Sequence, residues 1–75
     1  MKINNPEIAE ALSHWLLEDD TILSLYEDDT LAIVVSGRNN YDGTAAIEVL
    51  RLFAIGDRWE VSKDRHISIL GDIEE

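Results

Sequence analysis

The stretch that decides the fold is YDGTAAIEVLRLFAIGDRW, residues 41–59, which carries a turn signal near each end. Asp42-Gly43 favours a two-residue hairpin turn because both positions of such a turn require positive φ. Gly56-Asp57 favours a second tight hairpin. The segment between them, 44–54, would then be one strand, although its apolar spacing is also compatible with a helix.

Working outward, the segments 22–26 and 30–36 are rich in β-branched and aliphatic residues, which indicates two more strands. A three-residue turn at 27–29 joins them, and the turn at 56–57 leads into a fourth strand. With these turn lengths, directly opposed residues place one set on a single sheet face without any charge. Its members are Leu23, Leu25, Leu31, Ile33, Val35, Leu50, Leu52, Ala54, Trp59 and Val61. This agreement favours a strand at 44–54 and predicts a four-stranded antiparallel β-meander, with a short fifth strand at 66–70.

A helix start precedes the strands. Asn5 is a suitable N-cap, Pro6 suits the first helical position and Glu7 favours the positive end of the helix dipole. The apolar residues that follow fall on one helical face. They are Ile8, Ala11, Leu12, Trp15 and Leu16. We therefore expect one α+β domain over residues 1–75, with a helix from about 6 to 18 lying across the charge-free face and Trp15 meeting Trp59 in the core.

The predicted opposite face has a polar periphery and an apolar centre. It collects Ile22, Ser24, Tyr26, Ala32, Val34, Val49, Arg51, Phe53, Ile55, Arg58 and Glu60. One helix covers only one face of a sheet, and uncovered apolar area marks an interface. We expect Val34, Phe53 and Ile55 to form a homodimer or partner contact. The alternative is that the C-terminal segment covers this face.

Charge is the strongest compositional feature: 16 acidic residues against six basic ones give a net charge of −10. This argues against direct binding to nucleic acid, which requires cations to neutralise phosphates, and against an anionic membrane surface. Two acidic triplets stand at the two ends of the first predicted strand. They are Glu18-Asp19-Asp20 and Glu27-Asp28-Asp29. We predict that these six residues contact a protein partner; the alternatives are that Asp serves as a turn residue and that the charge serves solubility alone.

Several chemistries lack their residues. The chain has no cysteine, its two histidines are His14 and His66, and its four glycines are scattered and form no phosphate-binding loop. The adjacent aspartates do not have the alternating spacing of a calcium loop. We therefore predict a protein that is not an enzyme and has no cofactor or metal site. The absence of cysteine, of a long apolar run and of a signal peptide indicates a soluble, cytoplasmic protein.

In size and charge the chain resembles the small acidic proteins that phages use against CRISPR and restriction systems, some of which imitate nucleic-acid charge. That resemblance implies an inhibitor or masking protein that engages a basic, nucleic-acid-binding partner. The alternatives are a homodimeric accessory or assembly protein, and an immunity protein that neutralises a toxin.

Overall fold

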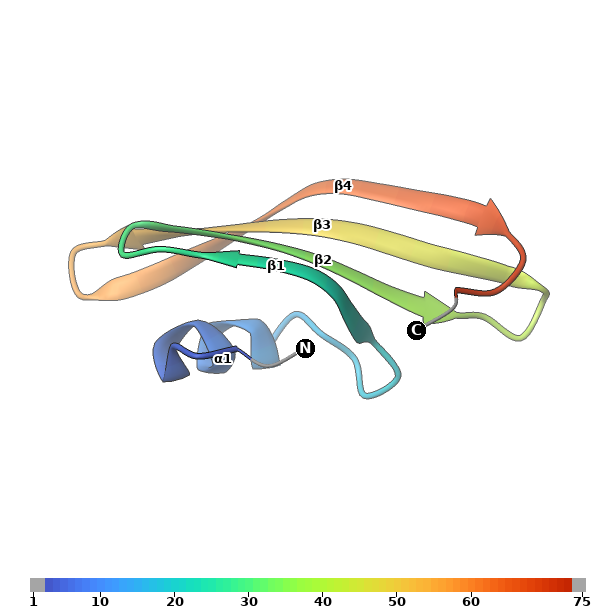
Figure 1. The fold of residues 1–75 in the computed structure, drawn as a ribbon, viewed down its shortest axis with the longest axis horizontal. Helices are drawn as coiled ribbons and strands as arrows, with labels where there is room; N and C mark the ends of the chain where they lie inside the picture. The colour runs from blue at the N-terminus through green and yellow to red at the C-terminus, as the bar shows by residue number, and fades with distance from the viewer. Residues whose placement is uncertain (1–2, 74–75) are drawn as a thin grey trace.

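The computed structural model describes residues 3–73, which form one helix and four strands (Figure 1). In chain order the elements are α1 (Pro6–Ser13), β1 (Thr21–Glu27), β2 (Leu31–Asn39), β3 (Thr44–Ile55) and β4 (Arg58–Leu70). The strands make one antiparallel meander in the order β1-β2-β3-β4, and α1 lies against one side of it. The predicted α+β class is therefore confirmed, and segment 44–54 is a strand.

Helix α1 begins as predicted but ends early. The Asn5 side chain accepts a hydrogen bond from the Glu7 N–H at 2.9 Å, and Pro6 occupies the first turn. The expected extension to residue 18 is wrong, because the Leu17 N–H donates to the Asp20 carboxylate at 2.8 Å and is not used to continue the helix. Trp15 consequently lies beyond the helix and is 44% exposed. The predicted contact between two buried tryptophans is also wrong, since only Trp59 packs against the core.

The turn between β3 and β4 confirms its prediction. Gly56 has φ of 61° at the first turn position, and the register opposes Leu52 to Val61. The β2–β3 connection differs by one residue. The Asn40 N–H bonds to the Thr44 carbonyl at 2.9 Å, which leaves a three-residue loop in which Gly43 alone has positive φ.

This one-residue difference turns β2 over. Val34, and not Val35, opposes Leu50. Because side chains alternate along a strand, every β2 residue that we placed on the charge-free face lies on the other one. The residues concerned are Leu31, Ile33 and Val35.

The β1–β2 turn is also one residue shorter than predicted. The Asp28 N–H bonds to the Leu31 carbonyl at 2.9 Å, so only residues 29 and 30 lie in the loop. Leu25 therefore opposes Val34, and the predicted pairing with Leu31 is wrong. The shorter β1–β2 turn and the longer β2–β3 loop together keep Leu25, Val34 and Leu50 on the face that meets α1.

The hydrophobic core lies between α1 and that face. Its buried members are Ile8, Leu12, Ala32, Val34, Leu50 and Leu52. Val34 is fully buried here. It therefore cannot belong to an exposed dimer face, and that part of the prediction was wrong for the register reason just given.

Strand β4 continues to Leu70, so residues 66–70 are its second half and form no separate fifth strand. A bulge at Asp64 accommodates the extra residue, since Val49 opposes Arg65 and Leu50 opposes Lys63. The chain then turns back: the Ile73 N–H donates to the Asn39 side chain at 2.6 Å. Ile73 is thereby held against β2, and residues 74 and 75 lie outside the described part.

Candidate functional site

The first acidic triplet lies between α1 and β1, and its members behave differently. Asp20 turns inward, with a side chain only 2% exposed, and accepts hydrogen bonds from the Leu17 N–H and, at 3.3 Å, from Arg38 Nη1. The side chains of Glu18 and Asp19 make no hydrogen bond or ion pair with another residue of 3–73. Asp20 is therefore structural, whereas Glu18 and Asp19 remain available to a partner.

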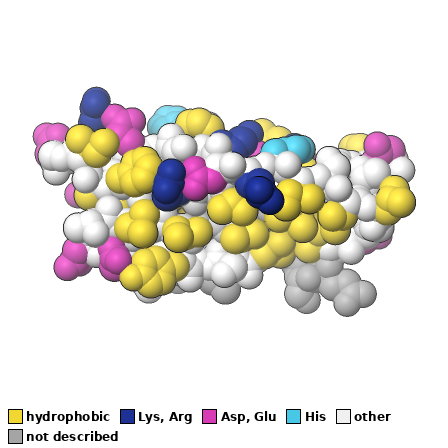
Figure 2. All heavy atoms as spheres, turned by 90° about the horizontal axis from the view of Figure 1, so that it is seen from above, with side chains coloured by type: hydrophobic (Ala, Val, Ile, Leu, Met, Phe, Trp, Pro, Cys, Tyr) yellow, Lys and Arg dark blue, Asp and Glu magenta, His cyan; other side chains and the backbone are white. Residues whose placement is uncertain are grey.

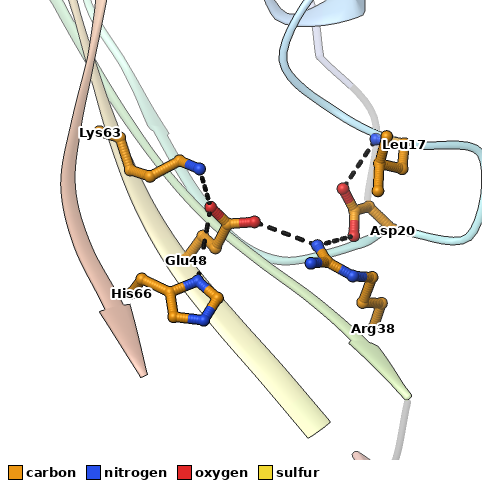
Figure 3. A network of polar contacts seen from close by, with 6 residues as sticks. All are labelled: Leu17, Asp20, Arg38, Glu48, Lys63 and His66. Carbon is orange, nitrogen blue, oxygen red and sulfur yellow. Dashed lines mark hydrogen bonds and ion pairs between the residues drawn. The ribbon is translucent and has the colours of Figure 1, made fainter. Parts of the chain in front are cut away.

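Asp20 belongs to an ionic network on the helix side of the sheet (Figure 3). Arg38 Nη1 also donates to Glu48 Oε1 at 3.1 Å, and Lys63 Nζ lies 2.5 Å from Glu48 Oε2. His66 Nδ1 is 3.7 Å from the same oxygen. Two carboxylates thus meet two permanent cations, which makes the cluster close to neutral.

The pKa of Glu48 reflects this setting. Glu48 is 7% exposed. Lys63 is the largest influence and lowers the pKa of Glu48; burial opposes it, and Arg38 adds to the lowering. The hydrogen bonds to Glu48 and Asp20 raise the pKa of Arg38. The network is held together as charged pairs and joins β2, β3 and β4 to the α1–β1 connection.

The second acidic triplet also divides. The Glu27 carboxylate accepts hydrogen bonds from the Asn4 N–H at 3.3 Å and the Asn5 N–H at 3.2 Å, which ties β1 to the start of α1. Asp28 closes the β1–β2 turn. Asp29 makes no side-chain hydrogen bond or ion pair within the described chain, so it is the member of this triplet left free.

Asp28 accepts hydrogen bonds from the Thr30 N–H and the Leu31 N–H, each at 2.8 Å, and from the Tyr26 hydroxyl at 2.8 Å. The Thr30 N–H contributes most, and together these donors lower the pKa of Asp28 to about 2. The same carboxylate raises the pKa of Tyr26. Asp28 therefore stays ionised at any ordinary pH as part of the turn.

Further acidic residues surround Asp29, and the sequence analysis did not select them. Two adjoining open grooves, of about 410 and 350 Å³, lie beside Trp59 at this end of the molecule. Their acidic lining residues are Glu7, Glu10, Asp29 and Asp57. Glu7 and Glu10 lie on the exposed side of the predicted helix and Asp57 lies in a predicted turn, so their exposure was foreseeable, but their approach to Asp29 required the fold.

The sheet face away from α1 is the third candidate surface. Figure 2 looks onto this side and shows hydrophobic side chains along much of it, with basic side chains among them. We call it the open face. Its apolar residues, assigned from strand register, are Tyr26, Leu31, Ile33, Val35, Ile47, Val49, Phe53, Ile55, Ile67 and Ile69. Phe53 and Ile55 lie here as predicted, and Ile33 stands where Val34 was expected.

Among residues 3–73 no group of three or more His, Asp or Glu side chains is placed to hold a metal ion. Helix α1, the one helix of this part of the chain, is too short to cross a membrane. Comparisons of the chain with protein-family models, with curated proteins and with solved structures find no match.

Proposed function

We propose that the protein is an interaction module that binds a protein partner with a basic surface and masks a nucleic-acid-binding site on it, in the manner of anti-CRISPR or anti-restriction proteins. The observation that carries the proposal is the presence of free carboxylates at both ends of strand β1. Glu18 and Asp19 precede β1, and Asp29 follows it beside Asp57.

The distribution of cations supports this reading. Most basic side chains are already engaged within the chain: Arg38 and Lys63 in the Glu48 network, Arg51 with Asp64 at 3.2 Å, and Arg58 with Glu60 at 2.9 Å. These four cations are therefore not available to the free carboxylates, whose negative potential extends into solvent. Such a field accelerates encounter with a cationic groove, and the effect weakens as salt screens it.

The geometry also matches a groove that normally holds a nucleic-acid strand. The two groups of free carboxylates are separated by β1, whose seven residues span roughly 23 Å at ~3.3 Å per residue. A partner that contacts both groups must present cations over a comparable length, as an extended phosphate-binding groove does.

The test requires a partner identified by affinity capture from the native host or its prey, followed by measured association rates. The variant Glu18→Gln/Asp19→Asn/Asp29→Asn removes three free carboxylates. We expect association to slow roughly tenfold at low salt, with the difference shrinking at high salt, because rim charges act mainly on the association rate. Circular dichroism should show an unchanged fold.

A matched control removes the same amount of charge at the C-terminal end of the sequence: Asp72→Asn/Glu74→Gln/Glu75→Gln. A markedly smaller effect for this control supports local recognition by the acidic ends. If both variants slow association equally, the net charge of the chain accounts for the effect and the proposed site is wrong. If neither variant alters binding at low salt, the acidic surface serves solubility and the proposal is wrong.

A further inference from the structure

The open face is apolar in a molecule with a small core. Ile33, Ile55 and Ile67 are exposed there at 36%, 52% and 40%, while Val35, Val49 and others are half-buried. On the other side of the sheet, α1 is only eight residues long. A domain of this size has little stability to spare, so burial of a second apolar surface would add substantially to it.

The charge of the open face differs from that of the whole chain. Its charged side chains are Arg51, Arg58, Arg65, Glu60 and Asp64. Three cations against two carboxylates give this face a balance of +1, although the chain as a whole carries −10. The free carboxylates described above lie at the turns and on α1.

This balance bears on which partner can cover the face. A strongly basic surface is attracted to the acidic ends and gains nothing from the open face, whereas a second copy of the chain presents the same apolar and nearly neutral surface. Two copies can therefore meet here without bringing their free carboxylates together. Arg51 is paired with Asp64, and its guanidinium lies 5.0 Å from the centroid of the Phe53 ring. Its charge is therefore already partly neutralised before a dimer contact buries it.

The size of the face suits a stable dimer. The molecule measures 41 × 21 × 18 Å, and the open face follows its long dimension. A contact over most of that face approaches the roughly 800 Å² per partner of a standard interface. Within the described chain, Ile73 packs at the end of the open face near Gly37, and Ile33 and Ile67 remain exposed.

We propose that two copies of the chain pack open face against open face, forming a two-fold β-sandwich with a helix on each outer side. Two sheets packed in this way interdigitate side chains and build a second core between them. This inference does not rest on the proposed function: the acidic ends stay on the outside of the sandwich and remain accessible.

The test measures molecular mass by sedimentation equilibrium from submicromolar to near-millimolar concentration, together with the concentration dependence of the melting temperature. The wild-type chain should sediment as a dimer at micromolar concentration, and its melting temperature should rise with concentration, because association stabilises the folded state by mass action. Ile33→Glu and Ile33→Lys should each weaken the dimer at least a hundredfold. Both signs of charge are used because the apolar contact should reject either.

Leu17→Glu is the matched control, since Leu17 is 60% exposed on the α1–β1 connection and away from the open face. It should leave the dimer intact. Ile55→Glu provides an independent variant should a substitution at Ile33 unfold the chain. A wild-type monomer near millimolar concentration would overturn the proposal, as would a dimer that survives both Ile33 variants and Ile55→Glu; the latter result would point to pairing along the β4 edge.

Discussion

At the scale of single residues, identical side chains in the two acidic triplets have different roles. Glu27, Asp28 and Asp20 accept hydrogen bonds from backbone N–H groups, whereas Asp19 and Asp29 do not. The difference depends on which backbone donors each carboxylate can reach. For Asp28 the sequence held a usable signal. An Asp two residues before a Thr is typical of a turn in which the Asp side chain accepts a hydrogen bond from the Thr N–H.

Glu48 carried no comparable signal in the sequence, because its partners Arg38 and Lys63 lie on other strands. Its replacement gives our first stability prediction. Glu48→Gln keeps the shape of the side chain but removes the charge that Arg38 and Lys63 share. We expect the free energy of unfolding at neutral pH to fall by about 1–3 kcal/mol, since a nearly buried ion pair loses one partner. Urea unfolding measures this directly.

The pH dependence of this loss follows from the pKa of Glu48. That pKa is lowered from 4.5 in the folded state, so its charge stabilises the fold above about pH 4.5 and the contribution is lost as pH falls further. Wild type and Glu48→Gln should therefore converge in stability at acid pH. The exposed pair partner Glu60 provides the control: Glu60→Gln should cost at most about 1 kcal/mol. An equal deficit of Glu48→Gln at pH 3 and pH 7 would contradict the ionic role.

At the scale of elements, the sequence predicted the four strands and the helix start, but it placed β2 with the wrong face toward the helix and expected a separate fifth strand. The alternation of apolar residues in 30–36 does not distinguish its two faces, because Leu31, Ile33 and Val35 are as apolar as Ala32 and Val34. Only the turn lengths decide between the faces, and a turn signal such as Asp42-Gly43 also fits a three-residue loop. The internal consistency of our register was therefore not sufficient proof of it.

The helix end and the acidic network were missed for a related reason. Both depend on contacts between residues far apart in the sequence, such as Asp20 with Arg38 and Glu48 with Lys63. Local propensity carries no information about such pairs. The separation of free from engaged carboxylates likewise needed the folded chain.

The contact of Ile73 with β2 gives an element-scale prediction. A Cβ at Gly37 would lie 2.5 Å from Ile73 Cδ1 and 2.9 Å from Leu23 Cδ1, both at the ends of flexible side chains. Gly37→Ala should therefore fold but displace the C-terminal turn. The Ile73 amide, which donates to Asn39, should then exchange with solvent at least tenfold faster in hydrogen-exchange NMR.

The compensating variant shows whether this clash is the cause. In an Ile73→Ala background the larger overlap is gone, so adding Gly37→Ala should disturb the residue 73 amide much less. Equal acceleration in both backgrounds would mean that Gly37 acts through β2 itself and not through its contact with Ile73.

At the scale of the whole molecule, the structure is a long, curved, four-stranded antiparallel sheet with a short helix against one half of it (Figure 1). Helix α1 spans about 12 Å at ~1.5 Å per residue, whereas β3 spans about 40 Å at ~3.3 Å per residue. The core under α1 reaches Leu50 and Leu52 of β3. Beyond them, the strand ladders continue to Thr44 of β3, and the Glu48 network and the C-terminal turn add side-chain contacts to the far half.

This unequal covering implies that the chain does not open as a single unit. The half beneath α1 is secured mainly by hydrophobic burial, which does not titrate, while the far half depends more on the ion pairs of Glu48, which acid removes. Acid should therefore release the distal ends of β3 and β4 as a separate cooperative segment while the helix-covered half stays closed. In residue-resolved amide exchange near pH 3, the amide of Ile47 should exchange through a low-energy opening and that of Leu52 only through global unfolding. In acid, one end of the sheet would then stay folded while the other end opens locally.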